Sequence, residues 1–161
     1  MNRNTEMIIN EVIFAMSWKP LLEKSEAEQW NSGSSFQQTF YHGTNDSESI
    51  KRRGFVESED EVNDHTGISF SEDERYASGY GKILSCKIYV KNPFEVNNEF
   101  WNGKGKRPQD KKIYDKVGED ATIGEMSLAI EQTGYDCWFS KIGGLIKEIR
   151  IFDKRRAVVF K

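Results

Sequence analysis

The 161-residue sequence contains few of the residues that build metal sites or disulfide frameworks: it has two cysteines and two histidines. A structural zinc ion takes four cysteine or histidine ligands, so we expect no metal site. Cys86 and Cys137 lie far apart along the chain, and neither falls in a motif described below. We therefore expect both thiols to be buried apolar side chains in a reducing compartment.

Long hydrophobic runs are also lacking, and none approaches the roughly 18 apolar residues of a membrane span. The most apolar early stretch, residues 7–16, is interrupted by Asn10 and Glu11, and no small-residue cleavage site follows it. We expect neither membrane association nor a secretory leader, and we expect a cytoplasmic location.

The sequence also lacks a large excess of charge of one sign, because it has 23 lysines and arginines and 26 aspartates and glutamates. The net charge of −3 gives no general attraction to nucleic acid or to an anionic membrane. Basic residues still gather in Lys104–Lys112 and in Lys154–Arg156. Such runs are usually solvated surface, and the alternative is contact with an acidic acceptor, which could be protein, RNA or DNA.

The chain does contain enough apolar material for one domain, with 37% hydrophobic residues that include 10 Phe, 6 Tyr and 4 Trp. Residues 1–31 show helical periodicity, with an apolar stripe at residues 8–16 and Pro20 suited to the first turn of a second helix. A serine- and glycine-rich turn follows at residues 31–35. We expect an N-terminal helical extension over residues 1–35, packed on a domain that spans residues 36–161.

After residue 36 the pattern changes to short strands with interposed helices, bounded by glycine, proline and capping residues. The absence of regular strand–helix alternation favours an α+β fold. The expected strands cover residues 40–43, 67–70, 83–90, 135–140, 145–152 and 157–160. The expected helices begin at Asp46 or Ser47, at a Ser71–Glu74 capping box that leads through Tyr76 and Tyr80, and at a Thr122–Glu125 capping box. Residues 57–64 and 102–112 are expected to be loops.

Three short stretches carry residues suited to bind a flat, polar ligand, although each is a weak signal alone. Tyr41–Thr44 reads Tyr-His-Gly-Thr and presents an imidazole beside an unhindered glycine backbone. Gly67–Ser71 reads Gly-Ile-Ser-Phe-Ser and leads into tyrosines at positions 76 and 80, which share one face of a helix. Glu148–Asp153 reads Glu-Ile-Arg-Ile-Phe-Asp, and a glutamate that opens an apolar strand is costly unless its charge faces a cleft.

In this order and spacing, the three stretches resemble the ADP-ribosyltransferase superfamily, in its diphtheria-toxin and poly(ADP-ribose)-polymerase-like branch with the signature His-Tyr-Glu. His42 and Glu148 match the first and last signature positions, and Tyr80 matches a further tyrosine eleven residues after the middle one. The resemblance covers about residues 38–161, and the Gly134–Asp136 strand with its glycine turn also looks like the small bacterial and phage members. It implies a split pair of antiparallel sheets that form an NAD cleft, with the N-terminal helices outside it.

The resemblance implies a mono-ADP-ribosyltransferase, a glycosyltransferase that uses NAD as co-substrate and releases nicotinamide. Three residues would be catalytic: His42 would hold a ribose hydroxyl, Tyr80 would stack on the nicotinamide, and Glu148 would bind the 2′-hydroxyl and stabilise the ribose cation. A carboxylate fixed beside that carbon is most useful when positive charge develops there. The NAD-binding set implied is His42, Gly43, Thr44, Ser69, Phe70, Tyr76, Ser78 and Tyr80.

The small size and the lack of a leader suggest a bacterial toxin or phage effector in the cytoplasm of the producing or infected bacterial cell. Its partner would be a macromolecular acceptor, more often a protein than RNA or DNA, and an antitoxin or regulatory partner is an open alternative. Ser69 stands where the signature has its middle tyrosine, so one wall of the nicotinamide site is either missing or supplied from elsewhere, with Tyr76 and Tyr41 as the candidates. Ile146 stands where arginine-modifying members carry a second glutamate, so arginine is not the expected acceptor.

Structural roles are the alternatives for these residues. His42 could be a hydrogen-bonded strand-end histidine, Tyr76 a core side chain and Glu148 an edge-strand charge. Two other functions also fit the sequence. The Ser69 departure motivates a non-catalytic module that binds NAD or ADP-ribose or docks a partner. A ribonuclease toxin would use His42 or His65 with Glu148 as acid and base, although His65 in its acidic loop is expected to be solvated.

Overall fold

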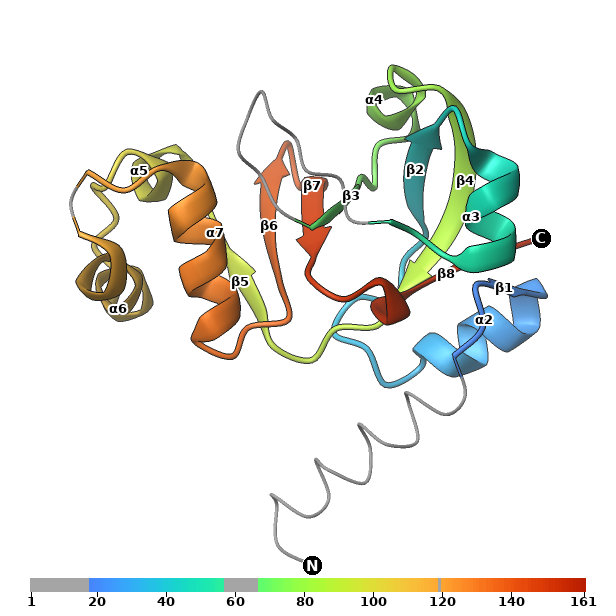
Figure 1. The fold of residues 1–161 in the computed structure, drawn as a ribbon, viewed down its shortest axis with the longest axis horizontal. Coiled ribbons are helices and arrows are strands. Elements are labelled where there is room, and N and C mark those ends of the chain that lie inside the picture. The colour runs from blue at the N-terminus through green and yellow to red at the C-terminus, as the bar shows by residue number, and fades with distance from the viewer. Residues whose placement is uncertain (1–17, 57–66, 119) are drawn as a thin grey trace, which may run out of the picture.

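The computed structural model describes residues 18–56, 67–118 and 120–161 (Figure 1). These residues form an α+β fold, as predicted, with two four-stranded sheets and six α-helices. The predicted apolar stripe at residues 8–16, the acidic loop at residues 57–64 and His65 lie outside the described residues.

Both sheets are mixed. One contains, in spatial order, β1 (Leu21–Leu22), β8 (Ala157–Phe160), β4 (Lys82–Ile88) and β2 (Phe40–Thr44). The other contains β3 (Ile68–Phe70), β7 (Leu145–Ile151), β6 (Cys137–Ile142) and β5 (Pro93–Glu95). The expectation of antiparallel sheets is therefore wrong at one edge of each, because β1 runs parallel to β8 and β5 parallel to β6. A parallel pair needs a crossover connection, and the long helical segment between β5 and β6 supplies one.

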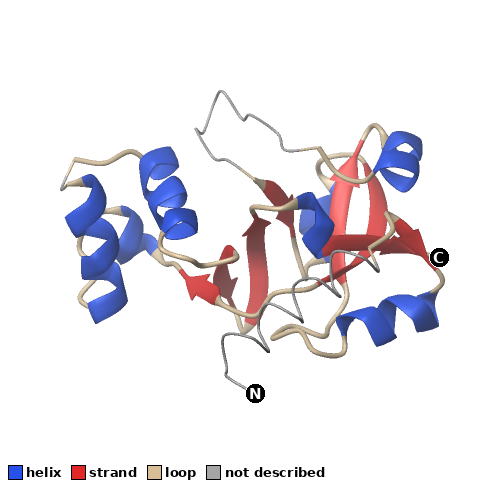
Figure 2. Cartoon of the chain, turned by 60° about the horizontal axis from the view of Figure 1, so that its bottom comes forward, coloured by secondary structure: helices blue, strands red, loops and turns tan. Residues whose placement is uncertain are grey.

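The helices lie at the periphery of the sheets (Figure 2). Near β2 and β4 lie α3 (Ser47–Arg53) and α4 (Glu74–Ser78), and α2 (Lys24–Asn31) packs on β4 and β8. The other helices form a layer beyond β5, at the opposite end of the molecule: α5 (Asn98–Trp101), α6 (Pro108–Val117) and α7 (Ile123–Gln132). A 3₁₀ turn, η1 (Lys154–Arg156), precedes β8. No helix within the described ranges is long and apolar enough to span a membrane.

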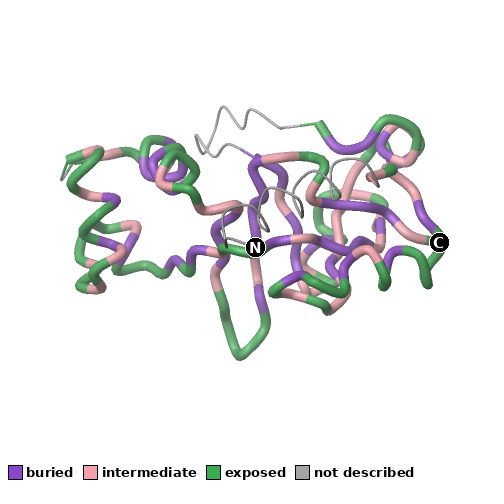
Figure 3. The backbone as a smooth tube through the Cα atoms, turned by 90° about the horizontal axis from the view of Figure 1, so that it is seen from below, coloured by how far each residue is buried: buried purple, intermediate pink, exposed green. Residues whose placement is uncertain are grey.

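The largest cluster of buried side chains draws on both sheets and includes Phe40, Phe70 and Ile149. A second cluster joins α5, α6 and α7 to β5 and β6, and includes Trp138. Figure 3 shows buried stretches through the middle of the molecule, whereas the outer helices alternate between buried and exposed residues. Both cysteines lie fully buried in the first cluster, as predicted, and burial raises the pKa of each thiol.

The two sheets meet at an isolated bridge between Tyr41 of β2 and Ser71, the residue after β3. The Tyr41 N–H donates to the Ser71 carbonyl at 2.7 Å, and the Ser71 N–H donates to the Tyr41 carbonyl at 2.9 Å. Beside this bridge, residues of β2, β3 and β7 line one shared space.

The N-terminal segment differs from its prediction. Pro20 does not open a helix: it precedes β1, and α2 begins only at Lys24, with Glu23 as its N-cap. Leu21 and Leu22 pair with Val159 and Phe160 of β8, and this long-range pairing overrides the local helical pattern. Residues 18–31 thereby contribute β1 to the edge of the first sheet and α2 to the layer that covers β4 and β8.

Two helix boundaries also differ. The predicted Ser71–Glu74 capping box does not form: the N-cap of α4 is Asp73, whose carboxylate accepts the Tyr76 N–H, and the Ser71 hydroxyl accepts the Asp73 N–H. This helix ends at Ser78, before Tyr80. The predicted loop at residues 102–112 is half helical, since Pro108 opens α6 at a position where its missing N–H costs nothing. The Thr122–Glu125 capping box is confirmed at the start of α7.

Candidate functional site

A pocket of about 790 Å³ opens where the two sheets meet. Its lining comes from β2, β3, β7, α3 and α4, and its volume falls within the range of small-ligand sites, about 300–1,000 Å³. Most of the site residues implied by the resemblance line it: His42, Gly43, Thr44, Ser69, Phe70, Tyr76, Tyr80 and Glu148. Segments far apart in the sequence are thus brought to one place.

The open edge of β2 supplies main-chain hydrogen-bonding groups to this pocket. Within the described ranges, β2 is the edge strand of its sheet, and the side of its backbone away from β4 is bridged only at Tyr41, to Ser71. In antiparallel strands the N–H and C=O groups of alternate residues point to opposite sides. Those of Tyr41 point away from β4, toward Ser71. Gly43, two residues later, therefore directs its N–H and C=O to the same side, where the pocket lies.

Gly43 also lies directly against α4. A Cβ at this position would be 2.0 Å from the Ala77 carbonyl oxygen and 3.0 Å from the Tyr80 Cβ. The sequence predicts that this glycine lets a ligand approach the backbone. In the structure, α4 itself lies closest to Gly43. The missing side chain of this glycine therefore allows α4 to pack close to β2.

His42 is held in one orientation. Its Nδ1 lies 2.8 Å from the Ser69 carbonyl oxygen, and a carbonyl requires a donor, so Nδ1 carries the proton in the neutral ring. The ring packs against Phe55 and Phe70, with centroids at 4.9 and 5.3 Å. Burial lowers the pKa of His42, and the Ser69 carbonyl opposes this effect. At neutral pH the imidazole is therefore uncharged, and its Nε2 is a hydrogen-bond acceptor.

The lowered pKa of His42 predicts an acid-sensitive contribution to stability. The unfolded chain binds a proton at a pKa near 6.5, before the folded chain does, so the free energy of unfolding should fall as the pH drops below this value. Urea unfolding at pH 7.5 and at pH 5.5 measures this loss. We expect a smaller loss in His42→Gln than in the wild type. The matched variant His65→Gln should retain the wild-type loss; the reverse pattern would assign the effect to the other histidine.

Glu148 lies on β7 with 23% of its side chain exposed. Its Oε1 accepts a hydrogen bond from the Ser69 hydroxyl at 3.2 Å and another from the Arg150 Nε at 2.9 Å. Within the described part of the chain, Oε2 has no hydrogen-bond partner. The carboxylate is thus anchored through one oxygen and offers the other to the pocket.

Tyr76 and Tyr80 form an aromatic pair at the mouth of the pocket. Their ring centroids are 5.7 Å apart, and the Tyr80 hydroxyl donates to that of Tyr76 at 3.3 Å. This hydrogen bond, together with burial, raises the pKa of Tyr76. Tyr80 is 62% exposed, so much of its ring is accessible to a ligand at the mouth of the pocket. Tyr76 belongs to neither large core cluster, so its alternative role as a core side chain is wrong.

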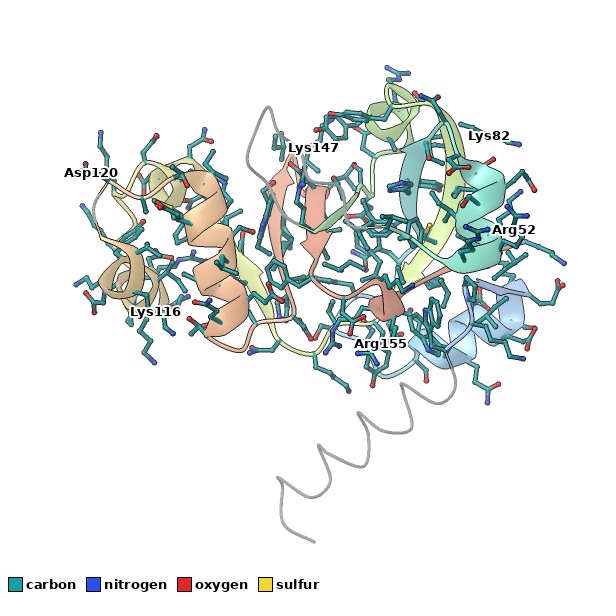
Figure 4. All side chains as sticks on the ribbon, in the orientation of Figure 1. Arg52, Lys82, Lys116, Asp120, Lys147 and Arg155 are labelled. Carbon is teal, nitrogen blue, oxygen red and sulfur yellow. The ribbon has the colours of Figure 1, made fainter. Side chains whose placement is uncertain are left out.

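Two contacts connect the N-terminal end of α4 with β7 at the mouth of the pocket. Lys147 forms an ion pair with Asp73 at 2.7 Å, and its ammonium lies 4.7 Å from the centre of the Tyr76 ring. Figure 4 shows Lys147 at the end of β7 that faces α4. Glu72 adds a second connection, because its carboxylate accepts the Ile146 N–H at 2.9 Å. These contacts fix Tyr76 relative to the strand that carries Glu148.

Some predicted residues do not join the site. Ser78 does not line the pocket, and its hydroxyl donates to the Arg75 carbonyl within α4. The basic segment Lys104–Lys112 lies in and before α6, at the end of the molecule opposite to the pocket; Figure 4 labels the neighbouring Lys116 there. In Lys154–Arg156, Arg155 pairs with Asp153 at 2.6 Å.

Two further residues, Arg150 and Phe55, line the pocket without having been expected there from the sequence. Arg150 stands two residues after Glu148 on a strand, and this spacing places the two side chains on one face. This two-residue spacing in the sequence could have indicated that Arg150 lies beside Glu148. Phe55 has no comparable sequence signal, because it enters the pocket from the segment after α3. No cluster of His, Cys, Asp or Glu suited to a metal ion occurs among the residues of ranges 18–56, 67–118 and 120–161.

Comparison with models of known protein families finds none that matches the chain, and comparison with curated proteins finds no match either.

Proposed function

We propose that this protein is a mono-ADP-ribosyltransferase that moves ADP-ribose from NAD to a macromolecular acceptor and releases nicotinamide. The observation that carries the proposal is that Glu148, His42 and the free backbone edge at Gly43 line one pocket, with the Glu148 Oε2 unpartnered among the described residues. A small bacterial toxin or phage effector with an intracellular acceptor remains the biological setting that we propose.

The pocket offers complementary groups for each part of the nicotinamide riboside. The Nε2 of His42 can accept a hydrogen bond from a ribose hydroxyl. The Gly43 N–H and C=O match the acceptor and donor of a primary carboxamide. The exposed Tyr80 ring, with Tyr76 beside it, offers an aromatic surface for the nicotinamide, which supplies a wall that Ser69 cannot.

The proposed chemistry needs one well-placed negative charge. The bond between the ribose C1′ and the nicotinamide nitrogen breaks, and its electron pair leaves with nicotinamide, which becomes neutral. Positive charge then develops on the ribose, where the Glu148 carboxylate stabilises it. The acceptor forms the new bond to C1′ and loses its proton to solvent, so NAD and the acceptor yield ADP-ribosylated acceptor, nicotinamide and a proton.

The proposal is tested by incubating adenylate-labelled NAD with a bacterial lysate and the protein, followed by digestion of the products with protease or nuclease. We expect label in macromolecules with the wild type and with Glu28→Gln, an exposed glutamate on α2 that serves as the control. Glu148→Gln should remove the label. The digests then distinguish a protein acceptor from a nucleic acid.

A non-catalytic NAD or ADP-ribose module is the second candidate, and it is motivated by Ser69, which stands where the signature has its middle tyrosine. NAD binding with neither label transfer nor nicotinamide release would support this candidate. Cleavage of RNA in the absence of NAD would contradict both and favour the ribonuclease hypothesis.

A further inference from the structure

Arg150 is the most buried charged residue of the pocket. It is 7% exposed, and its Nε donates a hydrogen bond to the Glu148 Oε1 at 2.9 Å. The Ser69 hydroxyl donates to that same oxygen at 3.2 Å. Two donors on one carboxylate oxygen define both its position and the direction in which the other oxygen points.

Strand register explains how Arg150 reaches this oxygen. In the second sheet Arg150 pairs with Ser69 of β3 on one side and with Trp138 of β6 on the other. Cross-strand partners share a face of a sheet, and Glu148 shares it too because it is two residues away on β7. The small serine leaves space beside Arg150, and the guanidinium carbon lies 6.0 Å from the centre of the Trp138 ring. The side chain is therefore confined between its two neighbours.

We propose that Arg150 is a positioning residue for Glu148. Arg150 holds the Glu148 Oε1 in place, so that only the Glu148 Oε2 faces the ribose. This inference rests on the proposed function for its catalytic consequence, while the contact itself stands independently. The terminal torsion of a glutamate is broad and two-fold, so an unheld carboxylate would sample many orientations. The planar guanidinium removes this freedom, which the flexible ammonium of a lysine does less well.

The geometry also separates positioning from substrate binding. A residue that acts only through Glu148 should change kcat, because Glu148 acts on charge that develops in the transition state. It should leave the KM for NAD nearly unchanged, and it should have no further effect once the Glu148 carboxylate has been removed.

The test is a double-mutant cycle of Arg150→Met and Glu148→Gln, measured as nicotinamide release, with thermal unfolding of each variant as the check on folding. We expect Arg150→Met to lower kcat by about 10- to 100-fold, because a misplacement of about 1 Å in a reacting group can cost about 100-fold. Arg150→Lys should recover part of this loss. The double variant should be no slower than Glu148→Gln alone. An equal loss in both backgrounds, or a raised KM with unchanged kcat, would overturn the inference.

A second measurement needs no turnover. In protein labelled with ¹³C at the glutamate side-chain carboxyl, the Glu148 resonance is assigned by its loss in Glu148→Gln. We expect it to shift in Arg150→Met and to stay in place in Arg155→Met, a variant that breaks an arginine–carboxylate pair outside the pocket. An unmoved resonance would refute the positioning role even in an active transferase. A shifted resonance in a protein without transferase activity would leave the contact intact and reject the proposed function.

Discussion

Replacing Gly43 with alanine should destabilise the protein by about 3 kcal/mol, at the upper end of the usual range for overpacking, and should distort the pocket. The added Cβ would lie 2.0 Å from the Ala77 carbonyl oxygen, a backbone atom that cannot turn aside as a flexible side chain could. The helix α4 has to move away from β2, and it carries Tyr76 with it. Urea unfolding measures the first effect, and NAD binding measures the second.

Gly79→Ala is the matched control for this prediction. Gly79 follows the same helix with φ −64° and ψ −16°, and its nearest neighbour to an added Cβ is 3.4 Å away. Alanine adopts this conformation without strain, so the variant should be as stable as the wild type or slightly more stable. Equal stabilities for Gly43→Ala and Gly79→Ala would show that α4 does not rest on β2 as described.

Glu148→Gln should lower kcat for nicotinamide release by about 100- to 1,000-fold, the usual cost of removing one group that stabilises transition-state charge. The amide keeps the size of the side chain and can still bind a hydroxyl, so the affinity for NAD should stay close to that of the wild type. Glu148→Asp keeps the charge but withdraws it from Ser69 and Arg150, which hold its Oε1. Because small misplacements of a reacting group cost about 100-fold, this variant should lose almost as much activity.

Initial rates of nicotinamide release, together with NAD titration calorimetry, separate the two quantities. A loss of NAD affinity equal to the loss of kcat in Glu148→Gln would assign the carboxylate to substrate binding. Full activity in Glu148→Asp would mean that charge alone matters at this position, and that the anchoring of Oε1 has no catalytic consequence.

The sequence predicts those parts of the site that depend on a short local pattern. His42, Gly43 and Glu148 each belong to a stretch whose strand character is visible in its residues, and all three line the same pocket. The start of α7 could also be predicted from the sequence, because a capping box is a local pattern. The sheets themselves were predicted in outline, and each has one parallel edge that no local pattern reveals.

The parts that escaped prediction depend on contacts between distant residues. Nothing within residues 18–24 shows that Leu21 and Leu22 pair with β8 rather than continue a helix. The hydrogen bond from Ser69 to Glu148 joins residues 79 apart, so the value of a serine at that position became visible only with the fold. For the same reason the close approach of α4 to Gly43 could not be inferred from the glycine alone.

The pairing of β1 with β8 also has a consequence for how the protein folds. The Trp18 indole donates to the Ala157 carbonyl across 139 residues, and β3 meets β7 across about half the chain. Non-local pairings form late and slow the folding of a domain, whereas the β6–β7 hairpin can form early because its strands are adjacent. A growing chain on the ribosome holds His42 and Gly43 long before it holds Glu148. The complete pocket therefore arises only after β7 has been synthesised and has paired with β3, and the proposed NAD chemistry is delayed until then.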